Sequence, residues 1–500
     1  EQGLRNNRVR TVIATSALEL GIDIGGLNAA VLAGYPGSIA GTWQRIGRTG
    51  RGRETSLGVL VTASHPLDQY LAQHPEYFFA QSPEQALINP DNPLILFKHL
   101  QCAAFELPFK PGQGYGELAT ELVAEYLEVL TEMGSLHKSG QRYFWMAEAY
   151  PAAEISLRSA SANKIIIQDH SLVPPRAIGE VDQESACWLL HPEAIYLHQA
   201  DTYLVEELDL QAGLACVRPI DSDYYTRPRS EVELQLNQEL ARTAASGCQK
   251  AYGEITVTTQ VVGYQKVRWE SQENLGFGEL DLPATQLQTS AYWLTLDDET
   301  VAALRDQGLW SNDPNQYGPD WHFQRNLARA RDGYRCQVCY RPEPEGSQFH
   351  VHHKVPFRSF NNPSEANQLS NLITLCPACH RRAENIVRIR SGLAGLAYCL
   401  GNLAPFFLMC DPGDLGVYAE AQSTLGTGQP TVAIYEMIPA GIGFSARLYA
   451  IHERLLAEAL KLVTGCQCTY GCPSCVGPGG EAGHGGKVET LAILRYLSEM

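Results

Sequence analysis

The sequence contains no uncharged apolar run of about 18 residues or more and no signal-peptide pattern, so it offers no candidate membrane-spanning helix or secretion leader. Charged residues are scarce at 19%, and the hydrophobic fraction of 44% is ordinary. This balance indicates a globular chain rather than a disordered one. We therefore expect a cytoplasmic protein of several domains with no membrane partner.

Strong positive charge is also missing, because the formal net charge is −17. The distribution is nevertheless uneven. Residues 325–390 carry eleven Arg and Lys against five Asp and Glu, and residues 1–53 carry seven against three. Local positive fields attract phosphates even on an acidic protein, so these two basic regions leave DNA as a candidate partner.

Cysteine, in contrast, is plentiful, and eight of the fourteen cysteines fall into two tight clusters. Without a secretion signal, paired clusters indicate metal sites rather than disulfides. Four thiolates suit a tetrahedral structural zinc, so we expect one Zn²⁺ in each cluster. The eight cysteines are Cys336, Cys339, Cys376 and Cys379 in the first cluster, and Cys466, Cys468, Cys472 and Cys475 in the second.

The order of apolar and turn-forming segments predicts a multidomain α/β chain. Strand patterns at Thr11–Ser16, Ala29–Pro36 and Leu57–Thr62, with a helix beginning near Ser38, are typical of a parallel sheet. A helical period over residues 115–133 leads into a possible β-wing, and alternating segments from 177 to 295 suggest a small antiparallel β domain.

We divide the sequence into five expected regions. In chain order they are part of a RecA-like domain, a helical or winged-helix-like region, a β-rich domain, a ββα-metal module, and a C-terminal α/β zinc-binding domain into which that module is inserted. Their expected bounds are 1–75, 76–175, 176–315, 316–390 and 391–500.

The first cysteine cluster encloses residues that a purely structural zinc site does not need. His352 and His353 are adjacent in VHHKVPF, Asn371 follows, and His380 comes directly after the last cysteine. Adjacent residues on a strand point to opposite sides, so one histidine can face a metal while the other faces a phosphate. Phosphodiester hydrolysis requires a base, a cation and a group that fixes the tautomer of the base.

This pattern resembles the HNH (ββα-metal) endonuclease family. The resemblance implies that His353 is the general base, that Asn371 braces the hairpin and orients the base, and that His352 and His380 bind one catalytic Mg²⁺, Mn²⁺ or Ni²⁺ ion. Many members have Asp where His352 stands, and imidazole suits Zn or Ni better than Mg. The alternative is an HNH fold without catalysis that serves as a zinc-stabilised DNA-binding module.

Two segments near the start, ATSALELGIDIG at 14–25 and QRIGRTGR at 44–51, resemble motifs V and VI of superfamily 2 helicases. These motifs belong to the second RecA-like domain. Arg48 and Arg51, one helical turn apart, could reach across a cleft to the ATP γ-phosphate and stabilise transition-state charge as arginine fingers.

The same resemblance gives three further residues a role. Gln44 and Arg45 would hold the helix at the interdomain face, and Asp23 would couple the nucleotide state to the grip on DNA. The phosphate-binding GxxxxGK[ST] loop is missing from the sequence. We therefore expect ATP hydrolysis only in an intact protein that also contains the first RecA-like domain.

The second cysteine cluster, GCQCTYGCPSCVGP, places four thiolates within one short glycine-containing segment. Zinc is the first interpretation and an iron–sulfur cluster the second, because four cysteines suit both. With HLQCAAFELPF at 99–109, MCDPGDLG at 409–416 and YEMIPAGIGFS at 435–445, the chain resembles the MrfA (YprA-like) family of DNA-repair helicases. That resemblance implies ATP-dependent translocation on DNA and a C-terminal four-cysteine zinc site. The HNH insertion makes defence against foreign DNA a rival to DNA repair.

Overall fold

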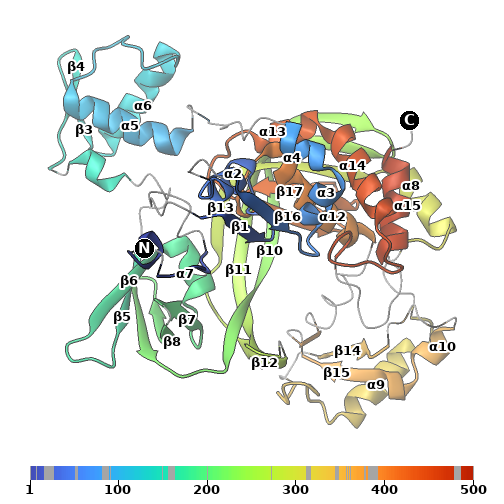
Figure 1. The fold of residues 1–500 in the computed structure, drawn as a ribbon. Helices are drawn as coiled ribbons and strands as arrows, with labels where there is room; N and C mark the ends of the chain where they lie inside the picture. Colours follow the sequence, from blue (N-terminus) through green and yellow to red (C-terminus); the bar gives the residue numbers. More distant parts are fainter. Residues whose placement is uncertain are drawn as a thin grey trace.

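The structure is a computed structural model of the chain (Figure 1). It describes residues 2–498 except for a set of short segments and single positions. These exceptions are residues 7, 16–26, 51–54, 81–88, 90–91, 149, 156–163, 200, 272, 311–316, 344–347, 356, 358–359, 361, 377–378, 381–391 and 478–485.

The RecA-like part contains the predicted strand–helix–strand unit. β1 (Ala29–Ala33) pairs in parallel with β2 (Leu57–Val61), and α2 (Ile39–Ile46) connects them. Ser38 ends the extended segment and caps the helix, since its hydroxyl accepts a hydrogen bond from the Gly41 N–H at 3.0 Å. The short α1 (Gln2–Arg5) precedes this unit.

The strand expected at Thr11–Ser16 is not present. Residues 11–15 are exposed and belong to no strand, and Ser16 lies outside the described residues. The sheet in this part consists of β1 and β2. A β-strand is defined by its ladder of hydrogen bonds to a neighbour, so an apolar β-branched sequence without such a neighbour does not form one.

The next region is a compact helical unit with a β-wing. α5 (Pro93–Glu106) and α6 (Thr120–Glu132) pack together, and β3 (Leu136–Ser139) forms an antiparallel hairpin with β4 (Arg142–Trp145). The predicted wing is confirmed. The helix expected from 115 begins at Thr120, because residues 115–118 form a separate turn. Before this unit lie α3 (Pro66–Gln73) and α4 (Pro75–Ala80), and after it the 3-10 helix η2 (Pro151–Glu154).

A five-stranded sheet of order β6-β5-β9-β8-β7 follows. The single antiparallel domain expected over 177–295 is wrong in two respects. Those residues divide between this sheet and a larger one, and within this sheet β5 and β9 run parallel. The chain passes through β6, α7, β7 and β8 between them, which gives it room to return in the same direction. The elements are β5 (Lys164–Asp169), β6 (Arg176–Asp182), α7 (Gln183–Leu189), β7 (Ile195–His198), β8 (Asp201–Asp209) and β9 (Leu214–Pro219).

The largest sheet joins segments that are far apart in the sequence. Its order is β10-β11-β13-β17-β16, and β12 pairs with the end of β11. β13 and β17 are neighbours although the whole HNH module lies between them in the chain, which agrees with an insertion into an existing domain. The strands are β10 (Tyr224–Ala245), β11 (Cys248–Arg268), β12 (Asn274–Glu279), β13 (Thr285–Leu296), β16 (Leu415–Glu420) and β17 (Thr431–Glu436).

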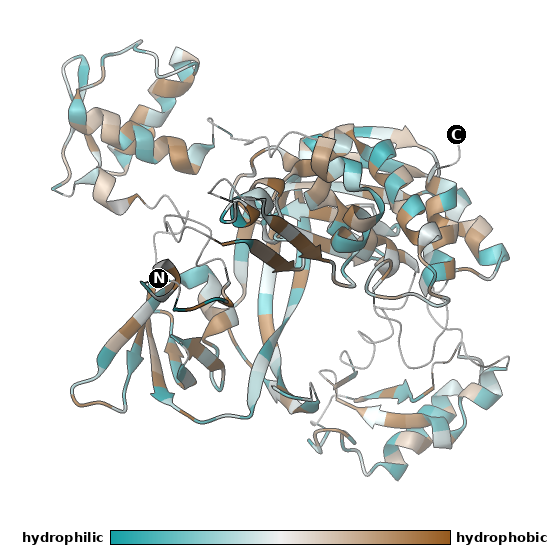
Figure 2. Ribbon diagram, viewed as in Figure 1, coloured by the Kyte–Doolittle hydropathy of each residue, from teal (hydrophilic) through white to brown (hydrophobic). Residues whose placement is uncertain are grey.

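Helices pack against this sheet and enclose the main core (Figures 1 and 2). Among the helices of the described part, none combines the length and the apolarity that crossing a bilayer requires. The remaining elements of this domain are α8 (Asp298–Asp306), α12 (Gly392–Leu408), the 3-10 helix η5 (Pro412–Asp414), α13 (Phe444–Ala450), α14 (His452–Gly465) and α15 (Gly486–Ser498).

The HNH module lies beside the main domain, next to β12 (Figure 1). Its hairpin strands β14 (His350–His353) and β15 (Leu372–Leu375) pair antiparallel, and α9 (Trp321–Arg331) covers one face. α10 (Pro363–Ala366) and the 3-10 helix η4 (Leu369–Asn371) lie between the strands in the sequence. Cys379 and His380 begin a further helical turn, and residues 381–391 lie outside the described residues.

Candidate metal centres and nuclease site

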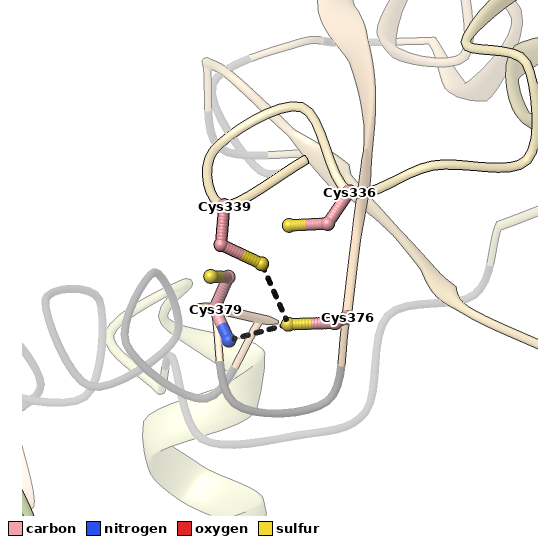
Figure 3. A group of neighbouring side chains, drawn as sticks. All are labelled: Cys336, Cys339, Cys376 and Cys379. Carbon is pink, nitrogen blue, oxygen red and sulfur yellow. Dashed lines mark hydrogen bonds between the residues drawn. The ribbon is translucent and has the colours of Figure 1, made fainter. Parts of the chain in front are cut away.

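The first cysteine cluster closes around one point. Cys336, Cys339, Cys376 and Cys379 have their sulfur atoms within 4.8 Å of one another, and Figure 3 shows the four side chains directed inward. The Sγ atoms of Cys339 and Cys376 are 3.7 Å apart. Because zinc–sulfur bonds are about 2.3 Å long, a tetrahedral site places its sulfurs about 3.8 Å apart. The geometry fits zinc.

Hydrogen bonds from the backbone favour the thiolate form at one of these four cysteines. Burial would raise the pKa of Cys336, but backbone N–H groups of Cys339, Cys376 and Val338 outweigh it and lower that pKa to about 7. The thiolate is the form that binds a metal. The ligands come from two loops far apart in the sequence, so a bound zinc ties them together.

The second cluster is as compact and comes from a single loop after α14. The Sγ atoms of Cys466 and Cys472, and those of Cys468 and Cys475, are 3.5 Å apart. All four sulfurs lie within 4.8 Å of one another. A cluster of several irons would hold its cysteines further apart than a single ion does, so this spacing favours zinc over the iron–sulfur alternative.

A buried lysine supports the second site. Lys487, at the start of α15, is only 7% exposed, and its Nζ donates hydrogen bonds to the backbone carbonyls of Cys466 and Cys468. A cation beside four thiolates offsets part of their negative charge. Gly471 lies in the left-handed region at φ 118°, where a Cβ atom would also meet Val476 at 2.7 Å.

The hairpin of the HNH module separates its histidines onto two faces, as the alternation of a strand predicts. On one face, His352 meets His380 with ring centroids 5.5 Å apart and nearly perpendicular planes. His350, two residues earlier on β14, stacks on His380 at 4.5 Å. Burial, and then the neighbouring His350, lower the pKa of His380 to about 4. Its imidazole is therefore neutral at physiological pH, which is the form that ligates metals.

His353 occupies the other face and is 7% exposed. Its ring packs beside the stacked pair Tyr317 and Trp321, with centroid distances of 5.4 and 5.1 Å, and Phe357 meets it edge-on. Burial lowers the pKa of His353, and the hydrogen bond to Asn367 opposes this only in part. The structure thus brings His352 and His380 together and places His353 apart from them.

Asn367 fixes the tautomer of His353. Its Nδ2 donates to the Tyr317 carbonyl at 2.6 Å, which leaves its Oδ1 as the acceptor 3.0 Å from His353 Nε2. Because a carbonyl can only accept, the amide cannot be reversed, and His353 Nε2 must carry the proton. The lone pair then sits on Nδ1, where it is able to take a proton from water.

Asn371 braces the hairpin but does not contact His353. Its Oδ1 accepts from the Val355 N–H at 2.8 Å, and its Nδ2 donates to the carbonyls of Val355 and Ala366 at 3.1 and 2.9 Å. The bracing role implied by the resemblance agrees with these contacts. The asparagine that bonds to the ring of His353 is Asn367, because the loop between the hairpin strands brings the end of α10 to that ring.

The helicase residues are described only in part. Gln44 and Arg45 lie in the last turn of α2, and Arg48 follows the helix. The helix ends before Arg48, because Gly47 is its C-cap and Thr49 bridges to Leu27. Asp23 and Arg51 lie outside the described residues, as does most of the first helicase motif.

Sequence reasoning missed Asn367, His350 and Lys487. His350 shares strand parity with His352, so the i, i+2 rule could have identified it once the strand was assigned. Asn367 and Lys487 gave no local signal, because their partners lie 14 residues or more away in the sequence.

Comparisons with known protein families match four segments of the chain. The conserved C-terminal domain of helicases matches residues 1–53, and the winged helix domain of the ATP-dependent helicase HRQ1 matches 88–160. The HNH endonuclease family matches 336–385, and the MrfA Zn-binding domain matches 396–476. The last match assigns zinc to the second cysteine cluster.

Three individual proteins extend the comparison. The ATP-dependent helicase YprA of Bacillus subtilis is 35% identical over 499 residues, which is 100% of this chain and 55% of YprA. The ATP-dependent helicase hrq1 of Schizosaccharomyces pombe is 26% identical over 61% of this chain and 28% of its own. A crystal structure of the DUF1998 helicase MrfA bound to DNA has a TM-score of 0.55 and 34% identity, and covers 99% of this chain and 55% of MrfA.

The chain therefore spans about half the length of YprA and MrfA. Its four matched segments follow one another in the order helicase C-terminal domain, winged helix, HNH module and zinc-binding domain. Its β13–β17 pairing encloses the HNH module within the region that carries the zinc-binding domain. The chain is therefore similar over its whole length to about half of the MrfA (YprA-like) helicases, and its residues 336–385 match the HNH endonuclease family.

Proposed function

We propose that this chain works within an ATP-dependent DNA helicase and that its HNH module hydrolyses DNA phosphodiester bonds with one divalent metal ion. The observation that carries the nuclease proposal is the two-sided hairpin. It offers His352 beside His380 on one face, and His353 with a fixed tautomer on the other. These residues supply a metal site and a base, the two things that hydrolysis needs most.

The residues divide the reaction as follows. His353 Nδ1 takes a proton from water, and the resulting hydroxide attacks the phosphorus of the phosphodiester and displaces the leaving oxygen. Asn367 keeps the ring in the tautomer that this step requires. His352 and His380 would hold the divalent ion, which when bound stabilises the charge on the phosphate and the leaving oxygen. All-imidazole ligation favours Ni²⁺ or Zn²⁺ over Mg²⁺ and Mn²⁺.

The motor activity is proposed for the protein together with a first RecA-like domain. The apolar strands β1 and β2 are brown in Figure 2, and Val31 and Leu57 are 66% and 60% exposed. An exposed apolar surface of this kind supports a partner domain there. MrfA has been crystallised with DNA and with the nucleotide analogue AMPPNP, which supports the same two ligands here. DNA repair is the proposed context, and defence against foreign DNA is the rival.

The nuclease proposal is tested by cleavage of a supercoiled plasmid without ATP. The wild type, His353→Ala and the control His322→Ala, an exposed histidine of α9, are each assayed with Mg²⁺, Mn²⁺ and Ni²⁺. We expect metal-dependent nicking by the wild type and by His322→Ala, and a loss on the order of 10²-fold or more in His353→Ala. Equal nicking by His353→Ala would refute the assignment of the base.

The motor proposal is tested with Arg48→Ala in the protein that includes the first RecA-like domain. Loss of an arginine finger lowers ATP hydrolysis on the order of 10³-fold or more. We expect this loss with plasmid nicking unchanged, because Arg48 and the hairpin lie in different domains. ATP hydrolysis at the wild-type rate would contradict the role of Arg48.

One observation favours a second candidate function, in which the module binds DNA without cutting it. His353 is nearly buried and packs against two aromatic rings, as a purely structural histidine would. This candidate predicts that the wild type binds DNA but does not nick it, whichever of the three metal ions is added. The plasmid assay separates the two functions directly.

A further inference from the structure

We propose that His350 is the third imidazole of the divalent-metal site of the HNH module, together with His352 and His380. The proposal rests on the proposed nuclease function of the module and defines its metal site more closely. The cations concerned are first-row divalent ions that prefer nitrogen ligands, Ni²⁺, Co²⁺ and Zn²⁺.

The strand geometry places the three rings together. His350 and His352 are two residues apart on β14, so their side chains leave the same face of the hairpin. Their partners across the ladder are Leu375 and Ile373, which lie in the small core around the first cysteine cluster. His380 directly follows Cys379 of that cluster and faces both histidines. A bound zinc therefore fixes the position of His380 relative to the strand.

The distances place His350 nearer to His380 than His352 is. The ring centroids of His350 and His380 are 4.5 Å apart, against 5.5 Å for His352 and His380. An ion held by His352 and His380 therefore lies close to the ring of His350 as well. Three protein nitrogens also leave a coordination position open for water or a phosphate oxygen, as in catalytic zinc sites.

The three imidazole rings are close together, but their nitrogen atoms are not yet arranged around a single point. His350 and His380 are stacked with their planes 26° apart. In the described part of the chain, the two cysteine sets are the only groups of three or more ligands whose donor atoms all lie within 4.8 Å of one another. Ligation therefore requires rotation of side-chain torsions. His350 is exposed and can turn about χ1 and χ2 at little cost.

The test measures metal binding rather than cleavage. Protein with both cysteine sites filled by zinc, verified by elemental analysis, is titrated with Ni²⁺ by calorimetry and with Co²⁺ by visible absorption. Absence of thiolate-to-cobalt charge transfer verifies that the added ion does not replace zinc. The variants are His350→Ala, His350→Phe, His350→Asp and the control His322→Ala. Phe keeps a ring to stack on His380 without a ligand atom, whereas Asp restores a ligand without the ring.

We expect one Ni²⁺ site in the wild type and in His322→Ala, and affinity at least about tenfold weaker in both His350→Ala and His350→Phe. His350→Asp should recover binding and shift the preference toward Mn²⁺, because a carboxylate is a harder ligand. Wild-type affinity in His350→Phe would overturn the proposal, since the ring would then serve only for packing. Absence of any third metal site in the wild type would overturn it as well.

Plasmid nicking measured on the same samples separates this inference from the proposed function. If His350→Phe binds Ni²⁺ and nicks like the wild type, the nuclease stands and the third ligand is refuted. If the wild type binds Ni²⁺ through His350 but does not nick DNA, the site is real and the nuclease function is refuted.

Discussion

The two four-cysteine sites have the same chemistry but different surroundings. In the HNH module, the cysteines come from two loops separated by the hairpin, and they hold histidines close to one another. In the C-terminal domain, all four cysteines come from one loop that packs against the main core. Lys487 donates hydrogen bonds to two backbone carbonyls of this loop. Sulfur spacing is similar at both, so the spacing alone does not tell which site frames a reaction. The difference lies in what each zinc positions.

Removing one thiol from each four-cysteine site should have the largest effect and should separate the two sites most clearly. Cys376→Ser and Cys472→Ser should each lose one of two zinc ions, because binding free energies of about 10–16 kcal/mol are linked to folding at such sites. Cys376→Ser should unfold only the HNH module, whereas Cys472→Ser should loosen the core around α14 and α15. Zinc content and regional hydrogen exchange measure this.

The control for both is Cys102→Ser, a partly exposed thiol that belongs to neither site. It should keep both zinc ions. Loss of protection in the main core after Cys376→Ser would show that the two regions do not fold independently.

A second, smaller effect is expected from the buried ion pair of the HNH module. Arg329 donates to both oxygens of Glu343 at 2.8 Å, and the two side chains are only 9% and 8% exposed. Arg329→Met leaves a buried carboxylate unpaired and should cost the module about 3–5 kcal/mol of unfolding free energy. Arg341→Met breaks an exposed pair with Glu279 and should cost less than about 1 kcal/mol. Denaturant unfolding of the module compares them.

The same pair predicts a pH dependence. Burial would raise the pKa of Glu343, but the hydrogen bonds from Arg329 and from the Phe349 N–H outweigh it and lower the pKa. A lowered carboxyl pKa contributes stability above its unfolded value, about 4.3, that is lost as the pH falls through the folded value. Glu343→Gln should therefore flatten the acid limb of the stability curve of the module. An unchanged acid limb would contradict this role.

A third prediction concerns the tautomer of His353, which depends on its hydrogen bond with Asn367. Asn367→Ala frees the tautomer of His353, so nicking should fall on the order of 10²-fold while DNA affinity is kept. Gln368→Ala, an exposed neighbour, is the matched control and should nick normally. A rate of nicking that Asn367→Ala leaves unchanged would show that the tautomer is fixed by other contacts.

The smallest effect is expected at the C-terminal site. Lys487→Met removes two hydrogen bonds to the cysteine loop, and zinc should be released to a chelator at about tenfold lower concentration. Lys461→Met, an exposed lysine of α14, should behave as the wild type. Equal zinc retention by Lys487→Met and Lys461→Met would remove Lys487 from the metal site.

Much of this architecture could be predicted from the sequence, because its signals are local. The CxxC pairs and the β-wing each depend on neighbours in the chain, and the structure brings the cysteines together and forms the wing. The prediction of a strand at 11–16 was wrong, because a strand needs a neighbour to pair with and the sequence of these residues does not show whether one is present. The β13–β17 pair joins Ala291 to Tyr435, and the i, i+2 rule says nothing of such distant partners.

The positions of the candidate-site histidines could be predicted from the sequence, but the contacts that support them could not, and their roles stay predictions. Spacing identified His352, His353 and His380, whereas the partner of His353 depends on how the loop after β14 returns. That loop brings Asn367, not Asn371, to the ring. Sequence spacing cannot separate two asparagines four residues apart.

The measurement that tests the central claim most directly is binding and cleavage of one DNA duplex by wild-type protein and His353→Ala, in the metal that supports nicking. The account predicts equal DNA affinity and a loss of cleavage on the order of 10²-fold or more in His353→Ala. Cleavage equal to the wild type, or a wild type that binds DNA and never cuts it, would contradict it.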